Sequence, residues 1–135
     1  MNNENVKEVK NSKNRFELDG NVANISNVYT NQNGKKILRF DLAQNNNGNT
    51  QYVPIVLRGE LVNSYGNEIQ KGDWISVKGR ISTYQKDVER DGKTYKDKAI
   101  DILGFEITDR KNNKVYTSDG DIRDLEEKSN SEMER

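Results

Sequence analysis

The sequence predicts an all-β fold: a five-stranded Greek-key barrel with a short helix between the third and fourth strands. Apolar residues recur at every second position through most of residues 16–107, which is the spacing of half-buried strands. Turn-forming pairs such as Asn33-Gly34 separate these runs. The chain of 135 residues has the length of one domain, and its hydrophobic share of 31% indicates that part of it lies outside a folded core.

Three strands are expected in the first half of the chain. Phe16 begins a long first strand with apolar residues or glycine at alternate positions to residue 22, and Ile25 and Val28 follow after a slip of parity that predicts a bulge or bend near Gly20. An Asn-Gly turn follows at residues 31–34, and residues 37–42 resume the alternation. The third run, residues 52–58, directs three aliphatic side chains to one face and Tyr52 and Arg58 to the other. Pro54 lacks a backbone N–H, so this strand is expected to be an edge strand or irregular there.

A helix and two further strands complete the predicted order. Residues 60–69 are helix-like because Leu61, Tyr65 and Ile69 recur every four residues. A fourth strand is expected from residue 74, and a charged loop around residues 90–93 leads to the fifth strand. This order is that of an oligonucleotide/oligosaccharide-binding barrel, or OB-fold. A Greek-key sandwich would need more strands than the pattern supplies.

The charge distribution divides the chain into three segments. We expect a flexible N-terminal segment at residues 1–14, the barrel domain at residues 15–110, and a flexible acidic tail at residues 111–135, which holds five basic and seven acidic side chains. The sequence contains no run of about 18 apolar residues, the length needed to span a membrane, and the first residues include no hydrophobic signal segment. We therefore expect a cytoplasmic protein without membrane contact.

The missing residue types exclude several kinds of chemistry. The chain has no cysteine and no histidine, which excludes disulfides, thiolate catalysis, Cys-based zinc sites and the commonest general base. Five carboxylates could be considered for a divalent ion, but they alternate with lysines that can pair with them: Asp87, Glu89, Asp91, Asp97 and Asp101. We expect neither an enzyme nor a cofactor or metal.

Four segments resemble bacterial single-stranded DNA-binding proteins. Residues 18–22 are similar to the opening strand of that family, residues 39–43 to its second strand, and residues 52–61 to its third strand and helix entry. The run Lys71-Gly72-Asp73-Trp74-Ile75-Ser76-Val77-Lys78-Gly79-Arg80-Ile81 is the closest match. Together the segments span residues 16–107 in the family order. The resemblance implies a non-catalytic OB-fold that binds single-stranded DNA, commonly as a homotetramer.

This function requires exposed aromatic rings that stack on bases and cations that contact phosphates. By the resemblance, Tyr52 lies where the family has a stacking aromatic, and Arg58 lies where many members have another. The predicted outward faces of the third and fourth strands, with two cations of the second strand, supply the candidate nucleic-acid-binding residues: Lys36, Arg39, Tyr52, Arg58, Lys78, Arg80, Tyr84 and Lys86. We predict sequence-tolerant binding in DNA replication, recombination or transfer.

The chain also departs from the family pattern. Lys86 stands where the family often has an aromatic residue, with Tyr84 two positions earlier on the same face, and the loop at residues 45–47 lacks an aromatic residue. The C-terminus ends Ser131-Glu132-Met133-Glu134-Arg135, without the acidic-hydrophobic tip through which the family docks on replication and repair partners. These departures predict weaker stacking and suggest a divergent member carried by a phage or plasmid.

Two alternative functions remain open from the sequence. An OB-fold adaptor would hold a strand or tail of a protein partner in the same groove and would not bind nucleic acid. For a DNA-binding protein, the partners to consider are replication or recombination proteins. Single-stranded RNA binding would use the same stacking and phosphate contacts as DNA binding. In each case we expect a homo-oligomer, because an exposed strand edge favours self-association.

Overall fold

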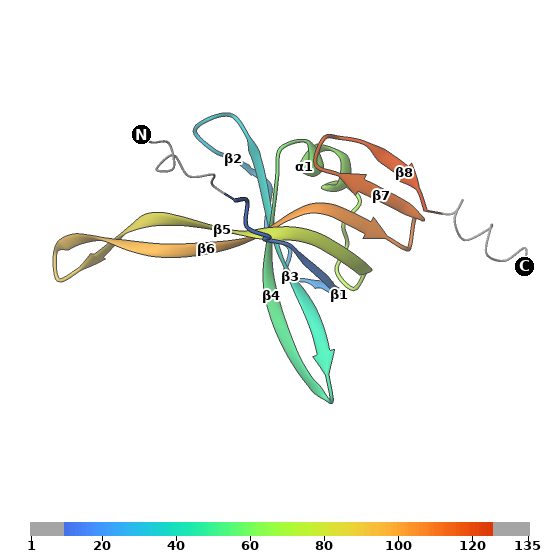
Figure 1. Cartoon of the computed structure of the whole chain (residues 1–135), viewed down its shortest axis with the longest axis horizontal. Coiled ribbons are helices and arrows are strands. Elements are labelled where there is room, and N and C mark those ends of the chain that lie inside the picture. Colours follow the sequence, from blue (N-terminus) through green and yellow to red (C-terminus); the bar gives the residue numbers. More distant parts are fainter. Residues whose placement is uncertain (1–9, 126–135) are drawn as a thin grey trace, which may run out of the picture.

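The computed structural model describes residues 10–125, which form a small barrel with two protruding ribbons (Figure 1). The barrel strands are β1 (Phe16–Ala23), β3 (Lys36–Asn46), β4 (Asn49–Arg58), β5 (Trp74–Arg90) and β6 (Lys93–Asp109). The remaining elements are β2 (Tyr29–Thr30), helix α1 (Glu60–Tyr65), β7 (Lys114–Thr117) and β8 (Ile122–Asp124).

Strand pairing closes the barrel. β1 pairs with both β3 and β5, β3 pairs with β4, and β5 pairs with β6, each antiparallel. A parallel contact between Val56 of β4 and Leu103 of β6 joins the two halves. The five-stranded OB-fold barrel predicted from the sequence, with a helix between the third and fourth barrel strands, is thereby confirmed. Pro54 lies in the part of β4 that pairs only with β3.

Hydrophobic side chains at alternate positions fill the barrel. The buried members come from all five barrel strands: Val22, Leu38, Phe40, Leu42, Ile55, Leu57, Ile75, Val77 and Ile107. Helix α1 covers one end of the barrel with Leu61 and Tyr65, and Ile69 packs against the same core. The helix is shorter than the expected residues 60–69 because Gly66 ends it.

Glycines allow the barrel strands to approach closely where β5 and β6 change register. A Cβ atom on Gly79 would lie 1.9 Å from the carbonyl oxygen of Leu103 and 2.7 Å from the Phe16 ring. A Cβ atom on Gly104 would lie 2.9 Å from Leu57. The register shift between Lys78 and Gly79 occurs at this point, so the bend in the β5–β6 pair depends on the missing side chains.

Both long hairpins continue beyond the barrel as two-stranded ribbons (Figure 1). Their turns are the pairs Asn47-Gly48 and Asp91-Gly92, and all four residues have positive φ, as type I′ turns require. The sequence predicts loops at residues 45–47 and around residues 90–93. In the structure, the strands instead continue almost to the turns. The sequence pattern does not reveal them, because ribbon residues that face water on both sides show no apolar alternation.

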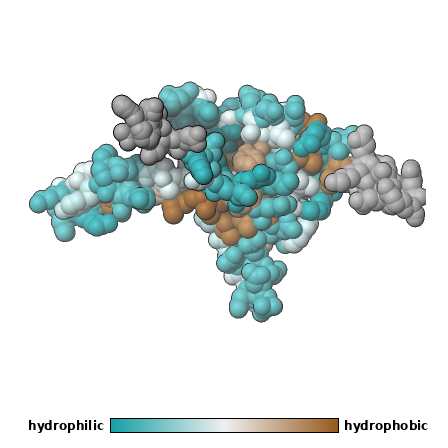
Figure 2. All heavy atoms as spheres, viewed as in Figure 1, coloured by the Kyte–Doolittle hydropathy of each residue, from teal (hydrophilic) through white to brown (hydrophobic). Residues whose placement is uncertain are grey.

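The barrel end opposite α1 exposes apolar side chains. Ile81 and Ile102 are paired on β5 and β6, and Ile100 follows at 62% exposure. Phe16 and Ile102 pack on the core from this side. Figure 2 shows hydrophobic surface between the bases of the two ribbons. We call Phe16, Ile81, Ile100 and Ile102 the open end.

The folded part of the chain extends beyond the expected domain boundary at residue 110. β7 pairs with β6, β8 pairs with β7, and Val115 and Tyr116 are buried. Residues 111–125 therefore form a hairpin on the fold, anchored by the two buried side chains Val115 and Tyr116. The other flexible parts expected from the sequence, residues 1–9 and 126–135, lie outside the described residues. Within the described range, the helix is too short to cross a membrane.

Candidate nucleic-acid interface

A small apolar floor lies on the outward side of the barrel, separate from the core. Ile37, Val56 and Leu103 form this floor and are at most 7% exposed. They come from β3, β4 and β6, which the parallel contact of Val56 with Leu103 brings side by side. Outward-facing aliphatic residues are rarely this buried unless longer side chains cover them. The floor therefore identifies the most sheltered part of the outer surface.

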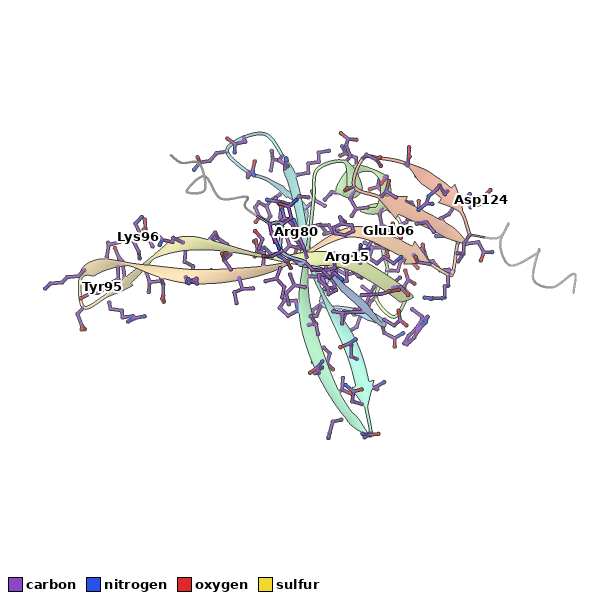
Figure 3. The ribbon with its side chains drawn as sticks, in the orientation of Figure 1. Arg15, Arg80, Tyr95, Lys96, Glu106 and Asp124 are labelled. Atoms are coloured by element: carbon purple, nitrogen blue, oxygen red, sulfur yellow. The ribbon has the colours of Figure 1, made fainter. Side chains whose placement is uncertain are left out.

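Three arginines surround the floor. In the strand registers, Arg58 pairs with Ile37, Arg39 with Val56, and Arg80 with Leu103. Figure 3 shows Arg80 where the β5–β6 ribbon leaves the barrel. The structure thus brings together three of the predicted site residues from three different strands. We call this surface the arginine face.

Arg58 and Arg80 border the same hollow. Lys35, Glu60, Leu103 and Phe105 also line it. Among the described residues, neither arginine has an ion-pair partner, and Lys35 has none either. Unpaired cations beside an apolar wall can contact a phosphate while a base packs on the wall. Lys35 was not predicted as a site residue, since in the sequence it belongs to a turn.

Arg39 differs from the other two arginines because its guanidinium has partners. Its Nη1 lies 3.6 Å from Oδ1 of Asp101, and its Nη2 donates a hydrogen bond of 3.4 Å to the Tyr29 hydroxyl. The hydrogen bond with Tyr29 raises the pKa of Arg39 above its ordinary value, with a smaller contribution from the Asp101 carboxylate. Tyr29 had no predicted role, and Asp101 was considered only for a metal ion.

Two exposed tyrosines lie further out on the ribbons. Tyr52 of β4 is 57% exposed and pairs with Ala43, while Tyr84 of β5 is 42% exposed and pairs with Ala99. Each ring therefore stands beside a small alanine, which leaves a ring face accessible. Flat exposed rings of this kind can stack on unpaired bases of any sequence.

The remaining predicted residues are more scattered. Lys86 lies on the same side of the β5–β6 ribbon as Tyr84, in register with Asp97. Lys36 lies near α1, beside Asn63, and Lys78 forms an ion pair of 3.6 Å with Glu106. The structure does not bring Lys36 and Lys78 together with the arginine face.

Comparison with known proteins gives one decisive match. Residues 13–104 match the model of the single-strand binding protein family. The chain belongs to this family. Its members are non-enzymatic DNA-binding proteins, and membership implies that this chain binds single-stranded DNA.

Solved structures agree with this family assignment at the level of the fold. The crystal structure of the mitochondrial single-stranded DNA binding protein Rim1 from S. cerevisiae is 18% identical, with a TM-score of 0.53. The match covers 71% of this chain and 93% of that chain. A comparison with curated protein sequences gives no match. The family match ends at residue 104, before β7 and β8. The hairpin of β7 and β8, which we call the C-terminal hairpin, therefore lies outside the matched region.

Proposed function

We propose that this single-strand binding protein binds single-stranded DNA on the arginine face, with little dependence on base sequence. The observation that supports this proposal is the ring of arginines around the buried floor of Ile37, Val56 and Leu103. Arg58, Arg80 and Lys86 would contact phosphates, and Tyr52 and Tyr84 would stack on bases. With only these two predicted stacking tyrosines, we expect weaker affinity than a fully aromatic site would give.

We further propose a role in DNA replication, recombination or transfer, since these processes expose single strands. The proposal includes self-association through the open end, where Ile81 and Ile100 are exposed. The departures at Arg58 and Lys86 support a phage or plasmid origin.

Titration of a labelled oligothymidylate at several salt concentrations tests the binding proposal. Affinity should fall with salt, and Arg58→Gln or Arg80→Gln should each flatten the slope of log K against log salt by about 0.7. Tyr52→Ala and Tyr84→Ala should each weaken binding by about 1–3 kcal/mol without changing that slope.

Arg123→Gln is the matched control for these arginine variants. Arg123 is exposed on β8 and pairs with Glu106 at 3.8 Å, away from the arginine face. Its loss should leave the slope unchanged. Wild-type binding that is absent at low salt, or insensitive to salt, would contradict the proposal, and competition between matched DNA and RNA oligomers would decide which is preferred.

A further inference from the structure

We infer that Arg39 is a stacking platform for a nucleobase rather than a phosphate ligand, and that Asp101 and Tyr29 are the residues that position it. This inference rests on the proposed binding of single strands to the arginine face. It gives Arg39 a chemical role different from that of Arg58 and Arg80, although all three border the same apolar floor.

The contacts of Arg39 reach across β4 and fix its guanidinium. Asp101 lies on β6 and Arg39 on β3, and β4 runs between them at the level of Val56. Tyr29 approaches from β2 on the opposite side. The guanidinium therefore lies between two groups from different elements, a hydroxyl that accepts its hydrogen bond and a carboxylate 3.6 Å away.

The charge of Arg39 is already partly neutralised. The Asp101 side chain is 20% exposed, compared with 46% for Arg39, so this ion pair is more sheltered than the pairs near the ribbon tip, such as Arg90 with Asp97. A phosphate that approached Arg39 would also meet the Asp101 carboxylate and be repelled. Arg58 and Arg80 form no ion pair among the described residues; Glu60 lines the hollow beside them, and so does the cation Lys35.

Neither recorded contact of Arg39 covers the flat face of its guanidinium. The hydrogen bond that Nη2 donates to Tyr29 and the Asp101 carboxylate 3.6 Å from Nη1 both engage the edge of the group, because guanidinium donors lie in its plane. The planar face can therefore stack on a base, as guanidinium groups do in nucleic-acid complexes.

A salt titration of oligothymidylate binding separates stacking from phosphate contact. Arg39→Lys keeps the charge and removes the planar group, so we expect affinity to fall about five- to tenfold with an unchanged salt slope. The matched control is Arg123→Lys on β8, which makes the same exchange outside the arginine face, at a residue that pairs with Glu106 at 3.8 Å, and should leave both affinity and slope unchanged. Tyr29→Phe, which loses the hydroxyl that anchors Nη2, should lower affinity less than Arg39→Lys and leave the slope unchanged.

Asp101→Asn tests the part played by the carboxylate. Removal of its charge frees Arg39 for a phosphate, so the slope should become steeper by up to about 0.7. Asp124→Asn removes a carboxylate that is paired with Lys114 at 2.7 Å on the C-terminal hairpin, and this control should leave the slope unchanged.

The outcomes distinguish this inference from the proposed function. Wild-type protein that binds with a salt-dependent affinity, together with an Arg39→Lys variant that binds equally well, would overturn the stacking role alone. An unchanged slope in Asp101→Asn would overturn the neutralising role of the carboxylate, and wild-type affinity in Tyr29→Phe would overturn the role of that hydroxyl. If the wild-type protein does not bind the oligothymidylate at all, the proposed function itself is overturned.

Discussion

Tyr65 packs against Tyr116 beneath the helix, with ring centroids 5.0 Å apart. Among the described residues, its buried hydroxyl has no hydrogen-bond partner. Burial raises the pKa of both tyrosines above the ordinary value, and the Asp109 carboxylate adds to the effect. The folded state thus retains two protons that the unfolded chain releases above about pH 10. Stability should be fully present below this pH and should fall as the pH rises further.

Tyr65→Phe should therefore stabilise the protein. It removes a buried hydroxyl without a partner, which we expect to raise the free energy of unfolding by about 1 kcal/mol at neutral pH. The loss of stability above about pH 10 should also become smaller. Urea unfolding at the two pH values measures both effects, with Tyr95→Phe on the exposed ribbon as the control. A less stable Tyr65→Phe variant would show that the hydroxyl has a partner, such as a buried water.

The arginine face shows what could be predicted at the level of single residues. Alternation along each strand correctly placed Arg39, Arg58 and Arg80 on outward faces, because period two fixes the side of a strand on which a residue lies. The pair of Arg39 with Asp101 could not be predicted in this way. It depends on the parallel contact between β4 and β6, and those strands are far apart in the sequence.

At the scale of whole elements, each long ribbon has its own turn signal in the sequence. Asn33-Gly34 predicts a turn, and the pairs Asn47-Gly48 and Asp91-Gly92, which have the same chemistry, close the two long ribbons. Their flanking residues are polar on both faces, so hydrophobic alternation gave no strand pattern there. Turn chemistry therefore identifies such ribbons better than hydrophobicity does.

The C-terminal hairpin should contribute directly to stability. Tyr116 is 4% exposed and Val115 is 8% exposed, and loss of a large buried aromatic residue costs about 3–5 kcal/mol. A chain ending at residue 110 should be strongly destabilised or unfolded, whereas a chain ending at residue 125 should unfold like the full-length protein. Thermal unfolding of the two truncations makes the comparison. Equal stability of both would show that β7 and β8 are dispensable.

At the scale of the molecule, the open end is the surface most suited to contact with a second copy. Ile100→Lys places a charge at a side chain that is 62% exposed, and we expect it to lower the mass measured by light scattering. Ile122→Lys is the control, because Ile122 is 52% exposed on β8, away from the open end. If both variants keep the mass of the wild type, this surface does not mediate self-association.

Trp74 is the chain's single tryptophan, and its side chain is 48% exposed. It pairs with Asn21 on β1, on the flank of the barrel away from the arginine face. Its fluorescence is therefore an intrinsic optical probe that needs no dye. A short oligomer confined to the arginine face should leave this emission unchanged, whereas a longer strand that wraps past β1 should quench it, so the length at which quenching begins measures how far the DNA travels around the protein.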